Sequence, residues 1–184
     1  MWLLILILLA GAAAAAWFFL LDHRTSVQIM EAEDGQDPIK RWARAAYVIV
    51  NGKFDPGSMN PGTTEAAHKA LQRDWGVTDP TGVGAKLVEL SQSPSGNVAW
   101  DQVRRIVLAR MAASAGFIPQ EASWSAIQQS KPALNSRYSG WEEVAADYRQ
   151  GLAAWSQNDS ERLAMFDLYA KEVGRPLWQV VSFR

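Results

Sequence analysis

The chain has 184 residues, with 18 basic and 19 acidic side chains and no cysteine. A formal net charge of −1 without a long basic run gives no sign of nucleic-acid binding, and the lack of cysteine excludes disulfides and thiolate metal sites. Hydrophobic residues make up 48% of the chain and charged residues 20%, a balance typical of a folded protein.

The first segment of the chain, residues 2–21, contains no charged side chain. As a helix it would cover about 30 Å, the thickness of the hydrocarbon core of a membrane. We therefore predict a retained transmembrane signal anchor, with the lipid bilayer as its partner. A cleaved signal peptide is the alternative, since Ala12–Ala16 offers small residues for cleavage, but no Lys or Arg precedes the apolar run.

The basic residues that flank this segment all follow it, at Arg24 and then Lys40 and Arg41. This bias favours a soluble domain on the cytoplasmic side, while the small number of charges leaves a periplasmic domain as the alternative. Residues 22–37 are polar and show no sustained period, which indicates a linker or a weak helix.

Residues 38–184 have apolar side chains at helical spacing and no sustained alternation, which predicts a single compact all-α domain. Capping residues such as Asp37 and Asn97 and stop signals such as Gly116 mark the expected boundaries. Short strands at 48–50 and 178–183 are alternatives. The predicted helices cover about 38–50, 63–75, 81–91, 97–115, 119–130, 139–155 and 158–174.

The predicted helix over 139–155 has a glycine inside its apolar face. Ser139 and Glu142 have the spacing of a capping box, and Trp141 and Trp155 bracket the helix on one side. Gly151 lies on that side and costs about 1 kcal/mol relative to alanine. This pattern predicts that another helix crosses closely at Gly151, with the two indoles filling the gaps on either side. The alternative is that Gly151 has no packing role and the helix simply tolerates it.

Two charged residues near the start of the predicted helix over 97–115 have the spacing of an ion pair. Asp101 and Arg105 are four residues apart, with the acid nearer the N-terminus, which suits both the pair and the helix dipole. The pair is interpreted as a structural salt bridge or as part of a ligand site.

Arg110 lies on the apolar face of the same helix, so we expect it to be buried and paired with a carboxylate or a carbonyl. Glu142, Glu143 and Asp147 on the helix over 139–155 are the candidate partners. The alternative role for Arg110 is an anion or partner site.

Three stretches of the chain together resemble an uncharacterised bacterial family catalogued as domain of unknown function 1266. They are AWDQVRRIVLARMAASAGFIPQEASW, SGWEEVAADYRQGLAAW and RPLWQ, and the resemblance extends over residues 40–184. RDWGV at 73–77 also fits, whereas Leu177 between Pro176 and Trp178 departs from the pattern. The resemblance implies no reaction and no catalytic residues. The positions that carry it are Trp100, Asp101, Arg105, Gly116, Phe117, Ile118, Trp141, Gly151 and Trp155.

Catalytic and metal-binding patterns find little support in the sequence. His68 follows Glu65 by three residues, but a di-metal helical bundle needs that motif twice. No elbow motif presents a serine to His68, and no phosphate-loop pattern is present. We therefore assign no catalytic residue, no cofactor and no metal.

The sequence thus predicts a membrane-tethered, non-enzymatic binding or adaptor protein in a bacterial inner membrane, with an unidentified protein partner. A sharper version is an immunity-type protein that neutralises a toxin. The alternative is a membrane-anchored hydrolase or transferase with a concave cleft lined by Asp, Glu and Arg. The candidate partner- or ligand-binding residues are Trp100, Asp101, Arg105, Arg110, Trp141, Glu142 and Asp147.

Overall fold

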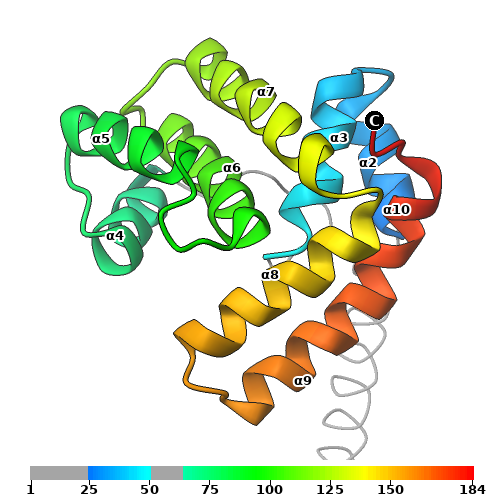
Figure 1. Ribbon diagram of the computed structural model, residues 1–184. Coiled ribbons are helices and arrows are strands. Elements are labelled where there is room, and N and C mark those ends of the chain that lie inside the picture. Colours follow the sequence, from blue (N-terminus) through cyan, green and yellow to red (C-terminus); the bar gives the residue numbers. More distant parts are fainter. Residues whose placement is uncertain (1–24, 51–63) are drawn as a thin grey trace, which may run out of the picture.

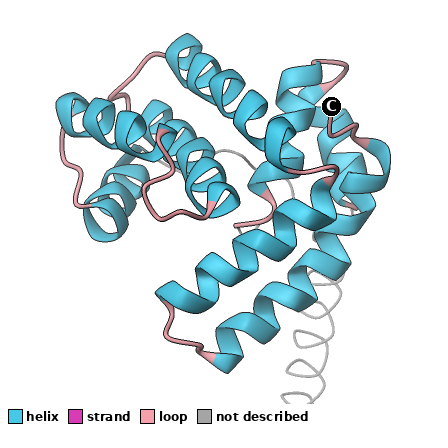
Figure 2. Ribbon diagram, in the orientation of Figure 1, coloured by secondary structure: helices cyan, strands magenta, loops and turns pink. Residues whose placement is uncertain are grey.

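The computed structural model describes residues 25–50 and 64–184 of the chain. The predicted anchor at residues 2–21 lies outside the described residues. All regular elements of the described part are helical (Figures 1 and 2). They are α2 (Ser26–Asp34), α3 (Pro38–Tyr47), α4 (Thr64–Trp75), α5 (Pro80–Ser91), α6 (Val98–Ser114), α7 (Gln120–Arg137), α8 (Trp141–Trp155), α9 (Ser160–Tyr169), a π-helical turn η1 (Ala170–Gly174) and α10 (Arg175–Val180).

The all-α prediction is confirmed for this part of the chain, and the two alternative short strands are wrong. Residues 48–50 form turns after α3, and the segment 178–183 begins inside α10. The chain stays helical past Gly174 because Pro176 lies in the first turn of α10, where its missing N–H is tolerated. α7 likewise runs seven residues beyond its expected end at 130, with Pro132 inside it.

Helix α6 is the centre of the domain, and it packs against α4, α5, α7 and α8 (Figure 1). From Ala99 to Ala113 every residue is buried except Arg104, because apolar residues occur on all sides of this helix. The Oδ1 atom of Asn97 caps the helix by accepting from the N–H of Trp100 at 2.7 Å. Gly116, with a φ of 74°, ends it as predicted.

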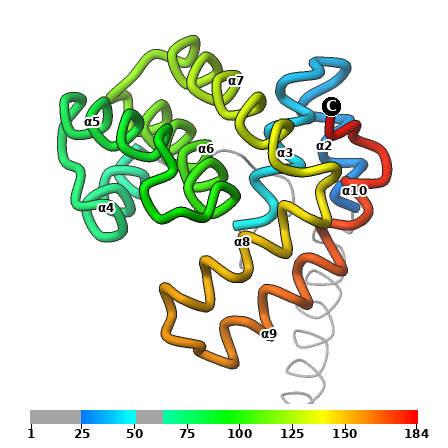
Figure 3. Tube along the Cα trace, in the orientation of Figure 1, coloured from blue at the N-terminus to red at the C-terminus, as the bar shows by residue number. Residues whose placement is uncertain are grey.

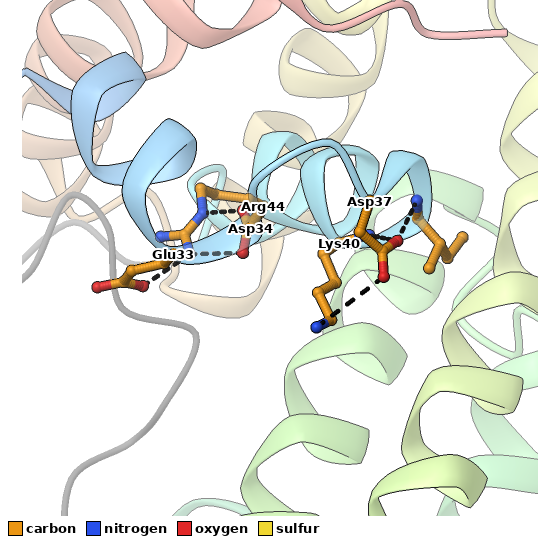
Figure 4. A network of polar contacts seen from close by, with 6 residues as sticks. Glu33, Asp34, Asp37, Lys40 and Arg44 are labelled. Carbon is orange, nitrogen blue, oxygen red and sulfur yellow. Dashed lines mark hydrogen bonds and ion pairs between the residues drawn. The ribbon is translucent and has the colours of Figure 1, made fainter.

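The expected linker contains a helix that packs onto the domain. α2 contacts α3 and α10, and its residues Ile29 and Met30 are buried. The Nε atom of Arg44 in α3 lies 2.5 Å from Oδ2 of Asp34, and both side chains are buried. Figure 4 shows this pair together with Asp37. Asp37 caps α3, as predicted, by accepting from the backbone N–H groups of Ile39 and Lys40.

The C-terminal segment is fixed to the domain by indole side chains. Nε1 of Trp42 donates to the carbonyl of Phe183 at 2.8 Å, and Nε1 of Trp141 donates to that of Val181 at 2.9 Å. The ring centres of Trp42 and Trp141 lie 5.3 Å apart. Trp141 is therefore part of the core, because its ring and its N–H are both satisfied inside the protein.

Helices α8 and α9 run side by side, and α8 also packs against α6 (Figures 1 and 3). Asp159, not the predicted Asn158, caps α9 by accepting from the N–H groups of Glu161 and Arg162. The residue that ends α8, Trp155, therefore lies at the tip of a helical hairpin.

Candidate partner-binding site

The predicted ion pair between Asp101 and Arg105 is absent from the described residues. Oδ2 of Asp101 instead accepts from the backbone N–H of Ser95 at 2.9 Å and from its hydroxyl at 2.6 Å. This carboxylate is buried and holds the loop that leads into α6. Helical spacing brings the two side chains near each other, which is why a pair was predicted. The pair does not form because the loop before α6 offers Asp101 hydrogen-bond donors.

Arg105 connects three helices through its guanidinium. It donates to the carbonyl of Leu87 in α5 at 3.2 Å, to the hydroxyl of Ser130 at 3.1 Å and to Oε1 of Gln129 at 2.8 Å, the last two in α7. Burial lowers the pKa of Arg105. All three recorded acceptors are neutral oxygens, so this cation is held without a carboxylate.

Arg110 is buried, as predicted, and two hydrogen bonds connect its guanidinium to α7. Nη1 donates to Oε1 of Gln120 at 2.8 Å and to the hydroxyl of Ser123 at 3.3 Å, and the guanidinium lies 4.4 Å from the ring centre of Trp124. Burial lowers the pKa of Arg110, while Tyr47 and Asp34 act in the opposite direction. These contacts connect Arg110 to α7 rather than to Glu142–Asp147, because α7 covers this face of α6.

Asp147 ties α8 to the start of α6. Its carboxylate accepts from the hydroxyl of Tyr138, and that hydroxyl accepts from the N–H of Ala99 at 3.0 Å. Nδ2 of Asn97 also donates to the backbone carbonyl of Asp147 at 2.6 Å. Burial and the bond to Asp147 both raise the pKa of Tyr138. The Asp147 side chain thus has a structural partner.

Glu142 is exposed, and the capping contact predicted for it belongs to Glu143. The carboxylate of Glu143 accepts from the backbone N–H of Ser139 at 2.7 Å and from its hydroxyl at 2.6 Å. The helix starts one residue later than predicted, with Gly140 as its N-cap, and this shift moves the third helical position from Glu142 to Glu143.

A row of indoles and guanidiniums crosses four helices, and we call it the indole–guanidinium ladder. Arg104 lies between two rings, 4.7 Å from the centre of Trp75 and 4.8 Å from that of Trp100. The rings of Trp100 and Trp155 are 6.1 Å apart, and Arg162 lies 4.9 Å from the ring of Trp155. The members, from α4 to α9, are Trp75, Arg104, Trp100, Trp155 and Arg162.

The ladder reaches the surface at Trp155, whose side chain is 60% exposed. A hollow of about 340 Å³ opens beside it. Arg104 is half-buried, and within the described residues its N–H groups meet no hydrogen-bond acceptor. The hollow is lined by Ser95, Asn97, Trp100, Gln150, Gly151, Ala154 and Trp155.

Sequence reasoning selected Trp100 as a binding residue but missed the other four members of the ladder, Trp75, Arg104, Trp155 and Arg162. The spacing of Trp100 and Arg104, four residues apart in one helix, was a usable signal for a stacked pair. Trp75 and Arg162 come from other helices, so only the fold brings them to the ladder.

Chemical groups suited to catalysis or metal binding are scattered in the part of the structure that is described. Nε2 of His68 lies 2.7 Å from the carbonyl of Ala115 and its ring stacks on Phe117. Over residues 25–50 and 64–184 no three His, Asp or Glu side chains gather into a metal-binding group. In the same two ranges, no helix has the length and hydropathy needed to cross a bilayer.

The fold and this surface define an all-helical domain with an aromatic and cationic ladder at its surface. A family model described as "Protein of unknown function (DUF1266)" matches residues 84–182, more than half of the chain, and the chain belongs to this family. The matched region covers most of α5 and continues into α10, whereas the resemblance expected from residue 40 to 83 lies outside it. Comparison with curated proteins and with solved structures gave no match.

Proposed function

We propose that this protein is a membrane-tethered, non-enzymatic binding or adaptor module that engages a protein partner through the indole–guanidinium ladder. The observation that carries the proposal is that Trp155 is 60% exposed while its ring is held between Trp100 and Arg162 of the ladder. Tryptophan and arginine are the residues that most often dominate binding energy at protein interfaces. A fixed indole also loses little conformational entropy when a partner covers it.

The distribution of the charged side chains supports binding over the alternative of a hydrolase or transferase. An enzyme of that type would gather Asp101, Arg105 and Arg110 around one cavity. Here Asp101 bonds to the loop before α6, Arg105 to α5 and α7, and Arg110 to the start of α7. Each of the three has a structural role at a different place, so they do not form a common reaction centre.

The tether in this proposal is the segment 2–21, which would hold the domain on the cytoplasmic side of a bacterial inner membrane. The sharper version is an immunity-type protein, in which the ladder covers part of a toxin at the membrane. Both versions use the same surface, so a single test of that surface comes first.

The test places a photo-cross-linking phenylalanine derivative at Trp155 in the full chain, expressed in its native host and irradiated in cells. We expect one discrete protein adduct in the membrane fraction. The matched control carries the same group at Val180, which is 51% exposed on α10 and outside the ladder. An equal set of adducts at both positions, or none at Trp155, would contradict the proposal.

A further inference from the structure

A second surface, separate from the ladder, lies over a different face of α6. α5 and α7 both pack on α6 (Figure 1), and a groove of about 550 Å³ runs between them. Arg104 and Arg105 are consecutive, so they point about 100° apart around α6. Arg104 joins the ladder and Arg105 lines the groove, and no residue belongs to both surfaces.

Each of the two walls of the groove is formed by residues on one face of a helix. Residues of α5 and α7 contribute at i, i+3, i+4 and i+7, so each wall extends over two helical turns, about 10 Å. Several of these side chains are small, which lets another backbone approach closely. The walls are Gly84, Leu87, Val88 and Ser91 on α5 and Ala122, Ser125, Ala126 and Gln129 on α7.

Within residues 25–50 and 64–184, the cation in the groove has no carboxylate partner. Arg105 is only 5% exposed, and its three recorded hydrogen bonds go to neutral oxygens of Leu87, Ser130 and Gln129. A guanidinium has five N–H donors, so two remain. Neutral acceptors only partly offset the cost of removing this cation from water. That cost is also why burial lowers the pKa of Arg105. A carboxylate entering the groove would supply the missing charge.

We propose that this groove receives an amphipathic helix of a partner protein, with an Asp or Glu of that helix pairing with Arg105. The two helically spaced stripes favour a helix because a third helix packs its own ridge between two such rows. Val88, 60% exposed at the rim, and Leu87 supply apolar contact. An adaptor would thus have two separate surfaces, so this inference goes beyond the proposed function.

The experiment introduces a photo-cross-linking residue at Ala122 in the full chain and compares Val88→Glu with Val88→Gln. The two variants have nearly the same shape, but only Glu adds a carboxylate to the groove that Arg105 lines. We expect Val88→Glu to reduce the adduct at least tenfold and Val88→Gln to keep it within threefold. Both variants should melt within a few degrees of the unaltered chain, since Val88 is exposed.

The adduct is then mapped by mass spectrometry. We expect a helical segment with an acidic residue among apolar ones, and changing that residue to Lys should remove the adduct. Equal yields from the two Val88 variants, a lipid or small-molecule adduct, or a mapped segment without an acid would overturn the inference. The adduct at Trp155 should persist in Val88→Glu, so failure at the groove alone leaves the proposed function standing.

Discussion

Gly151 of α8 lies directly against Trp100 of α6. A Cβ atom added to Gly151 would be 2.6 Å from Cβ of Trp100 and 2.7 Å from its Cγ, closer than such atoms approach in real proteins. The close crossing predicted from the sequence is therefore confirmed, and it brings α8 near enough for Trp155 to stack on Trp100. The second half of that prediction is wrong, since Trp155 is exposed and does not fill a gap in the core.

We predict that Gly151→Ala destabilises the protein by about 1–3 kcal/mol, because the methyl group overpacks the crossing. The matched control is Gly84→Ala, also inside a helix, where an added Cβ meets nothing within 4 Å. That change should stabilise by up to about 1 kcal/mol through helix propensity. Urea unfolding of the full chain in detergent gives both values. A higher urea midpoint for Gly151→Ala than for the unaltered chain would contradict the prediction, because it would show that the two helices can move apart at little cost.

The buried pair of Arg44 and Asp34 fixes α2 to α3 and gives a second prediction. Asp34→Asn keeps the shape of the side chain but removes its charge, and it should cost about 3–5 kcal/mol because a buried guanidinium loses its partner. Glu33→Gln is the matched control, since the Glu33 carboxylate also contacts Arg44 but its side chain is 43% exposed. We expect less than about 1 kcal/mol there. Similar losses for the two variants would contradict the buried character of the Asp34 contact.

Tyr138 gives a prediction about alkaline pH. Burial and the bond to Asp147 raise its pKa, so the folded protein holds this proton more tightly than the unfolded chain does. Its contribution is therefore fully present below the unfolded pKa, about 10, and is lost as the pH rises above it. Tyr138→Phe should cost about 1–3 kcal/mol at pH 7 through the lost bonds to Asp147 and Ala99.

The unfolding free energy of Tyr138→Phe should also decline less steeply than that of the unaltered chain above pH 10. Tyr148, whose pKa burial raises as well, stays in both proteins and serves as the internal reference. Parallel pH profiles for the two proteins would mean that the Tyr138 phenol ionises as readily in the folded state as in the unfolded one.

The proposed orientation in the membrane can be checked by fusion at Arg184. With the domain on the cytoplasmic side, a fluorescent protein fused there should fluoresce and alkaline phosphatase should be inactive. The unfused chain should sediment with membranes and keep its N-terminus. Strong phosphatase activity would place the domain in the periplasm instead.

Local sequence signals predicted the helices well, because a cap or a stop acts within a few residues. Asp37 and Asn97 begin α3 and α6 as expected, and Gly116 ends α6. The errors lie where tertiary packing overrides the local signal. Gly174 should have ended a helix, yet the chain turns through η1 and continues, with Gly174 packed against the indole of Trp178.

The partners of charged side chains were less predictable than the helices. Burial of Arg110 followed from its position on the apolar face, but the choice between α7 and α8 depends on which helix covers that face. Asp101 and Arg105 similarly had the correct spacing for a pair and found other partners. Within the ladder, only the pair of Trp100 and Arg104 could be predicted from the sequence, because these two residues share a helix. The other three members lie on other helices.

The most direct test of the central claim measures binding of the cross-linked partner to the full chain and to Trp155→Ala. An exposed indole that anchors a partner should cost about 2 kcal/mol or more when truncated, which is roughly a 30-fold weaker Kd. The thermal midpoint should hardly change, since Trp155 is 60% exposed, and Val180→Ala should bind like the unaltered chain. A Kd for Trp155→Ala within threefold of that of the unaltered chain would contradict the ladder as the partner-binding surface.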